Sequence, residues 1–171
     1  MTVSDVVDRL CAFRAAAIEP LPAAPVGTPS AIVGTPAALG WATVELDRAV
    51  RELSDALGIP PERFVAAADS RALGARCRVA DAALPDGAAL VVLEPATEGR
   101  LAATLARVGE GPAAIWLAVA DLVSARDVAR AAGIATSAEG DGPLGAEWLI
   151  LGGPIHGPHR LVVGAPGTIQ G

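Results

Sequence analysis

Hydrophobic residues between positions 109 and 134 follow first a strand-like and then a helix-like pattern. The run from Ala113 to Val119 is almost entirely apolar, which is typical of a buried strand. The residues after it place apolar side chains at helical spacing and stop at Gly133, a residue type that often ends helices. The pattern therefore predicts a strand followed by an amphipathic helix.

An earlier stretch, residues 39–59, has the same layout. Shifting it by 75 positions, without a gap, pairs Trp41 with Trp116 and Gly58 with Gly133. Because strand, helix and helix end all coincide, we interpret the chain as two copies of one strand-helix unit.

The remaining elements follow from the same periodicities and from turn residues between them. They are an N-terminal helix over 3–18, a Pro-rich arm to residue 37, short strands near 64–68, 74–80 and 88–93, a connecting helix over 98–108, second-copy strands near 134–138, 146–151 and 159–163, and a tail over 165–171. The sequence thus predicts an α+β fold with two βαβββ modules, residues 38–95 and 112–164.

Composition removes several function classes. The 171 residues carry a net charge of -6, and every basic residue is arginine. No basic run can follow a phosphate backbone, so we expect no nucleic-acid partner. Without lysine, Schiff-base chemistry, a Walker-type phosphate lysine and a Ser-Lys nucleophile all lack the amine that they need.

The N-terminal sequence and the two cysteines indicate the cellular compartment. The first ten residues are acidic and amphipathic, unlike a signal peptide, and no apolar run approaches the roughly 18–20 residues that span a bilayer. Cys11 and Cys77 have no metal or redox spacing, so we expect two reduced, buried thiols. We expect a cytoplasmic protein with no membrane partner.

Four short motifs resemble those of the vicinal oxygen chelate superfamily, and most of all its methylmalonyl-CoA epimerase group. They are VVLEP at 91–95, GEG at 109–111, VADL at 119–122 and AAG at 131–133. Their order and spacing agree with that group over about residues 38–164. The resemblance implies that the two modules form one curved mixed sheet around a cup.

In that superfamily the cup holds a divalent metal, bound by a His on the first strand and a Glu or Gln on the last strand of each module. Carried onto this chain through the motifs, the His positions fall on Leu39 and Ala114, and the carboxylate positions fall on Val91 and on or next to Leu161. None of these side chains can bind a metal. We therefore expect neither metal nor cofactor.

Strand alternation then predicts an apolar cup with two indoles, those of Trp41 and Trp116. The predicted ligand-binding residues are Leu39, Trp41, Val91, Ala114, Trp116, Trp148 and Leu161. Two interpretations stay open. Either the cup binds a hydrophobic or planar organic molecule, or its side chains fill it as ordinary core.

Polar candidates are few. His156 and His159 form an HxxH pair, but Pro158 and the neighbouring glycines disfavour a helix that would hold a metal half-site. His159 at a cavity mouth could act as a general acid-base group, or it could be a loop histidine bonded to backbone.

Strand alternation could also direct Glu147, Arg76 or Arg78 into the cup, where an arginine would bind a carboxylate or phosphate. The alternative is that these residues form the solvated face of the sheet. We take His159 and Glu147 as the catalytic candidates.

Three functions follow from these patterns. The preferred one is a metal-free protein that binds a hydrophobic small molecule in the cup. The second is a metal-independent isomerase, lyase or cyclase acting on an acyl or polyketide-like substrate, with His159 or Glu147 moving protons. The third is a non-catalytic association subunit, and a homodimer is compatible with all three.

Overall fold

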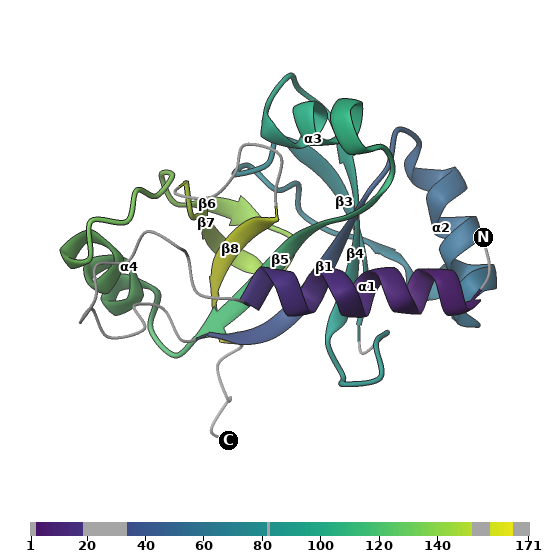
Figure 1. The fold of residues 1–171 in the computed structure, drawn as a ribbon, viewed down its shortest axis with the longest axis horizontal. Coiled ribbons are helices and arrows are strands. Elements are labelled where there is room, and N and C mark those ends of the chain that lie inside the picture. Colours follow the sequence, from purple (N-terminus) through teal and green to yellow (C-terminus); the bar gives the residue numbers. More distant parts are fainter. Residues whose placement is uncertain (1–2, 19–33, 82, 152–157, 166–171) are drawn as a thin grey trace.

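A computed structural model describes residues 3–18, 34–81, 83–151 and 158–165, and within them the chain forms four α-helices and one curled, mixed sheet of eight strands (Figure 1). The strands are β1 (Thr35–Ala42), β2 (Val65–Ala66), β3 (Ala75–Ala80), β4 (Ala89–Pro95), β5 (Gly111–Val119), β6 (Gly140–Gly142), β7 (Gly145–Leu149) and β8 (His159–Gly164). The helices are α1 (Val3–Ile18), α2 (Leu46–Leu57), α3 (Arg100–Val108) and α4 (Leu122–Ala131), with a 3-10 turn, η1 (Pro61–Arg63). The predicted α+β class and curved mixed sheet are confirmed.

The sheet order β2-β3-β4-β1-β5-β8-β7-β6 shows how the two copies join. In each module the first strand pairs in parallel with the last, β1 with β4 and β5 with β8. The two first strands then pair antiparallel with each other at the centre of the sheet. This arrangement places equivalent elements on opposite sides of the β1–β5 pair.

One face of the sheet, called here the outer face, carries α1, α2 and α4. Helix α2 buries Ala49, Val50, Leu53 and Ala56, which lie on one stripe, against β4 and its neighbours. Helix α1 lies across the central strands beside α2, and α4 covers the far end of the sheet (Figure 1). The apolar pattern of each helix therefore matches the surface that it covers.

Polar contacts hold the middle and the end of α1 on the outer face. Near the middle of the helix, Arg9 donates from Nη2 to the backbone oxygen of Glu110 at 2.7 Å, and its guanidinium lies 4.8 Å from the ring centre of Trp41. At its end, Arg160 donates from Nε to the backbone oxygen of Ala17 at 2.6 Å. These contacts satisfy a helix C-terminal carbonyl and fix α1 above β1 and β5.

The opposite face, called here the inner face, is the concave one. The sheet curls until the segment before β3 reaches the β6–β7 hairpin: Ser70 Oγ donates to Glu147 Oε1 at 2.5 Å, and the Arg71 amide donates to the Asp141 carbonyl at 3.1 Å. Helix α3 contributes Leu101 to the same buried cluster. The inner face is therefore enclosed by contacts between the two modules.

Two strand predictions need correction. No ladder forms over 134–138: Thr136 makes an isolated bridge with Ile150, and the second strand of the second module is β6, further along the chain. One reason is that the hydroxyl of Ser137 accepts the Leu149 amide at 2.9 Å, so a side chain replaces part of the ladder.

Strand β1 begins at Thr35, inside the predicted arm, and tolerates Pro36 where its register with β5 is irregular. The rest of the predicted arm, residues 19–33, and the tail from 166 lie outside the described residues.

Candidate functional site

The predicted cup residues divide between the two faces of the sheet. Val91, Ala114, Trp116 and Leu161 share the inner-face cluster. Leu39 and Trp41 pack on the outer face, and so does Trp148, which lies beneath α4. The prediction that all seven line one cup is therefore wrong in its geometry.

For Leu39 and Trp41 the error is a one-residue slip in the repeat alignment. The helix starts align Leu46 with Leu122, and the preceding caps align Glu45 with Asp121, which requires a shift of 76 rather than 75. With that shift the structural counterpart of Trp116 is Gly40. Because successive strand residues point to opposite faces, one position moves a side chain to the other side of the sheet.

The inner face is packed around Trp116. A Cβ atom at Gly40 would lie 2.9 Å from Cζ3 of Trp116 and 2.8 Å from Cδ1 of Leu93, so the indole occupies the space that a side chain on β1 would need. Val91, Ala114, Trp116 and Leu161 are all 0% exposed. For these residues the structure matches the interpretation that side chains fill the cup.

Glu147 places a carboxylate inside this packed face. Besides the Ser70 hydroxyl, it accepts the indole N–H of Trp116 at 2.6 Å, and Gly142 leaves room for it by having no side chain. Burial raises the pKa of Glu147 above its usual range, while the hydrogen bonds from Ser70 and Trp116 act in the opposite direction. Glu147 thus connects the two modules through buried hydrogen bonds, one from Ser70 in the first module and one from Trp116 in the second.

His159 is also buried on the inner face, under α3 rather than at a cavity mouth. Its Nε2 lies 2.9 Å from the hydroxyl of Thr104, which itself donates to the Arg100 carbonyl at 2.9 Å. A hydroxyl that donates to a carbonyl accepts from the ring, which assigns the proton to Nε2. His156, its predicted partner, lies outside the described residues.

The two catalytic candidates are not brought together. Glu147 pairs across the sheet with Val163, four residues along β8 from His159, which corresponds to about 13 Å of strand. Each has its own hydrogen-bond partners. The geometry does not place them as an acid-base pair.

The arginines predicted as alternatives lie at the solvated surface. Arg76 donates to Glu94 at 2.5 Å and Arg78 to Asp47 at 3.0 Å. Between them Cys77 is buried on the inner face, and burial raises the pKa of its thiol to about 12. Cys11, by contrast, is exposed, which corrects the prediction of two buried thiols.

No group of three or more His, Cys, Asp or Glu side chains in the described part of the chain is arranged to hold a metal ion. None of the described helices is long and apolar enough to cross a membrane.

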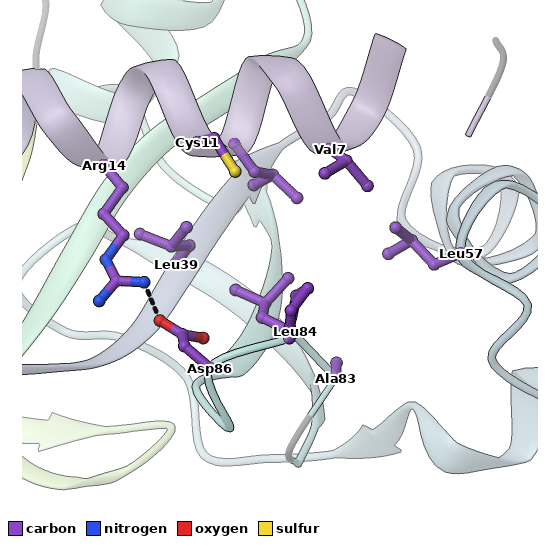
Figure 2. A pocket seen from close by; sticks show the side chains of 10 residues that line it. Val7, Cys11, Arg14, Leu39, Leu57, Ala83, Leu84 and Asp86 are labelled. Atoms are coloured by element: carbon purple, nitrogen blue, oxygen red, sulfur yellow. Dashed lines mark hydrogen bonds and ion pairs between the residues drawn. The ribbon is translucent and has the colours of Figure 1, made fainter. Parts of the chain in front are cut away.

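A pocket of about 360 Å³ opens on the outer face, between α1, the end of α2 and the segment before β4 (Figure 2). Its lining residues are Val7, Leu10, Cys11, Arg14, Leu39, Leu57, Ala83, Leu84, Pro85 and Asp86. Leu39 is thus a predicted ligand-binding residue that borders a pocket, on the face opposite to the one expected.

The helical spacing of Val7, Leu10, Cys11 and Arg14 is visible in the sequence, but it does not show what the helix faces. In the structure all four line the pocket, and Figure 2 shows Val7, Cys11 and Arg14 on the side of α1, with Leu39 and Leu84 facing the helix. The sequence therefore predicted the helix but not the pocket beneath it.

An ion pair between Arg14 and Asp86 closes one end of the pocket (Figure 2). Asp86 lies in a turn in which the Gly87 amide donates to the Leu84 carbonyl at 2.9 Å. The Oδ1 atom of Asp86 accepts a hydrogen bond from the Ala88 amide at 3.1 Å. Gly87 has φ of 82°, a conformation that favours glycine. The carboxylate is therefore held in place by its own turn.

Solved structures with this fold include methylmalonyl-CoA epimerases. The enzyme from Mycobacterium tuberculosis has a TM-score of 0.65 and 21% identity, covering 78% of this chain and 91% of its own. The Streptomyces coelicolor enzyme in complex with 2-nitronate-propionyl-CoA has a TM-score of 0.61 and 22% identity, covering 80% and 100%. A hypothetical protein from Bacillus halodurans has a TM-score of 0.63 at 13% identity, covering 82% and 100%.

These similarities show that the chain has the vicinal oxygen chelate fold, with the curled mixed sheet that the resemblance implied. Methylmalonyl-CoA epimerase is the named enzyme with which it shares that fold. No protein-family model matches the sequence, and no curated protein matches it at a significant level.

Proposed function

We propose that this protein binds a small hydrophobic organic molecule in the pocket under α1. The observation that carries the proposal is the pocket itself, about 360 Å³ in volume and lined mainly by aliphatic side chains. This volume is at the lower end of the range of about 300–1,000 Å³ for small-molecule sites. The ligand class is the one predicted from the sequence, and its place moves from the inner to the outer face.

The packing of the inner face supports this choice. A ligand there would have to displace Trp116 from its position against Gly40, and would break the hydrogen bond to Glu147. A ligand under α1 needs no such rearrangement, because the space is already present between the helix and Leu84.

The enzymatic alternative rests on Glu147, a buried carboxylate of raised pKa, which is a common property of catalytic acids. Its hydrogen bonds to Ser70 and Trp116 already account for its burial, however, and it lies across the sheet from the pocket. Binding without catalysis is therefore the better supported function.

Titration with N-phenyl-1-naphthylamine, a neutral apolar dye that fluoresces on leaving water, tests the proposal. Val7→Trp adds an indole to the pocket lining, and Val123→Trp makes the same change on an exposed position of α4, where Val123 is 66% exposed. We expect saturable binding to the natural protein and to Val123→Trp, and at least tenfold weaker binding to Val7→Trp.

Thermal unfolding of both variants controls for damage to the fold. The proposal is wrong if the natural protein shows no saturable dye binding, or if a folded Val7→Trp variant binds the dye as tightly as the natural protein does.

A further inference from the structure

We propose that the ligand of the pocket under α1 is amphipathic, with one carboxylate-like anionic group that binds Arg14 and an apolar body that occupies the rest of the pocket. This inference rests on the proposed function and adds the chemical class of the ligand. Three features of the pocket support it.

The first feature is where charge lies in the pocket lining. Arg14 and Asp86 are its charged residues, and they stand together at one end. Val7 lies seven residues before Arg14 on α1, which is about 10 Å of helix. A molecule lying along α1 would therefore meet charge at one end and aliphatic side chains along the rest of its length.

The second feature is the unequal hydrogen-bond capacity of the ion pair. Both oxygens of Asp86 are engaged, Oδ2 by Arg14 and Oδ1 by the Ala88 amide. Arg14 donates through Nη1, and in the described part of the chain its other guanidinium nitrogens have no partner. Since a guanidinium carries five N–H donors, the ion pair can bind a further hydrogen-bond acceptor more easily than a further hydrogen-bond donor.

The third feature is the partial exposure of the pair. The Arg14 side chain is 36% exposed and that of Asp86 is 30% exposed. An ion pair of this kind contributes little to stability, so Arg14 can share or exchange its carboxylate partner at small cost. An anionic ligand would then compete with Asp86 for the same guanidinium.

This competition makes a sharp prediction for the two partners. Arg14→Gln removes the positive charge and should weaken binding of an anion without weakening binding of a neutral analogue. Asp86→Asn removes the competing negative charge and should strengthen binding of the anion. Arg130→Gln is the control, because Arg130 forms a more exposed ion pair with Asp127 on α4, outside the pocket.

The experiment measures displacement of N-phenyl-1-naphthylamine by octanoate and by 1-octanol, at neutral pH, from the natural protein and these three variants. We expect the natural protein to prefer octanoate about tenfold, a preference of the size that a hydrogen bond to a charged group provides. It should fall to about one in Arg14→Gln with octanol binding unchanged, rise severalfold in Asp86→Asn, and stay unchanged in Arg130→Gln.

Equal displacement by octanol and octanoate from the natural protein would overturn the inference, and so would a preference for octanoate that survives Arg14→Gln. In both cases dye binding and its displacement by octanol would leave the proposed function standing. A protein that does not bind the dye at all would instead contradict the proposed function, so the two failures are distinguishable.

Discussion

Trp116 donates its indole N–H to Glu147 across 2.6 Å, and this hydrogen bond joins the first strand of the second module to β7 on the inner face. The same carboxylate accepts the hydroxyl of Ser70 from the first module. One buried acidic side chain on β7 thus links the central strand β5 to the segment before β3. Its partners explain how a carboxylate is tolerated there.

Removing that carboxylate should destabilise the protein. In Glu147→Ala the N–H of Trp116 and the hydroxyl of Ser70 both lose their acceptor, and an unsatisfied buried group costs about 1–3 kcal/mol. Urea unfolding should show a loss of at least this size. Glu147→Gln, which keeps an acceptor oxygen, should lose less, and equal losses in the two variants would contradict the hydrogen-bond argument.

The pH dependence of stability should carry a signature of the same residue. Because burial raises the pKa of Glu147 in the folded state above its ordinary value of 4.5, folding favours its protonated form. Its contribution is fully present below 4.5 and is lost as pH rises through the folded pKa. The unfolding free energy of the natural protein should therefore fall relative to that of Glu147→Gln as pH rises from about 4.5. A constant difference would show that Glu147 does not titrate as inferred.

Glu110 should show the opposite sign. Partial burial alone would raise its pKa, but hydrogen bonds from the Val44 amide at 2.8 Å, from Thr43 at 2.7 Å and from Arg48 at 2.5 Å outweigh burial and lower it. Its stabilising contribution is present above the unfolded value of 4.5 and is lost as pH falls through the folded pKa. Glu110→Gln should thus be less stable than the natural protein at neutral pH, and this deficit should shrink in acid.

Gly40 should not accept a side chain. Gly40→Ala places a methyl group against Trp116 and Leu93 at distances below normal contact, and such overpacking costs about 1–3 kcal/mol. Gly99→Ala is the control, since a Cβ atom there meets no other atom within 4 Å. Thermal unfolding should separate the two variants clearly. A Gly40→Ala protein as stable as Gly99→Ala would mean that the inner face is less tightly packed than described.

The two cysteines should differ in reactivity. Cys11 is exposed beside the pocket, while Cys77 is buried and the pKa of its thiol is raised to about 12. Iodoacetamide at mildly alkaline pH should add one group to the folded protein and two after unfolding in urea, as measured by mass spectrometry. Saturating 1-octanol should slow the first addition. Modification of both cysteines in the folded protein would contradict the burial of Cys77.

Much of the fold could be predicted from local patterns. The apolar run at Ala113 to Val119 and the helix end at Gly133 are each encoded in a short stretch, so they appear where expected. The repeat also predicted two modules, because both copies must bury the same kind of helix against the same kind of sheet. The strand prediction at 134–138 failed because a hydrogen bond to a distant residue decides the local structure there. The hydroxyl of Ser137 accepts the Leu149 amide and takes the place of a ladder bond.

The candidate site depended on register, which local patterns specify less well. Trp41 and Trp116 look equivalent in the sequence, yet they lie on opposite faces, because the helix starts at Leu46 and Leu122 set a repeat one residue longer. With a side-chain period of two, that single residue decides which face a tryptophan occupies. Hydrophobicity alone cannot reveal it, since both faces of the central strands are buried.

The sequence by itself determined the number of modules, the identity of most strands and helices and the absence of lysine chemistry. Tertiary structure alone decided that Trp116 fills the inner face and that the pocket lies under α1. The physical reason is that a cavity is the space left between surfaces from distant parts of the chain. The stripe from Val7 to Arg14 is local, but its facing wall at Leu39 and Leu84 is brought to it only by folding.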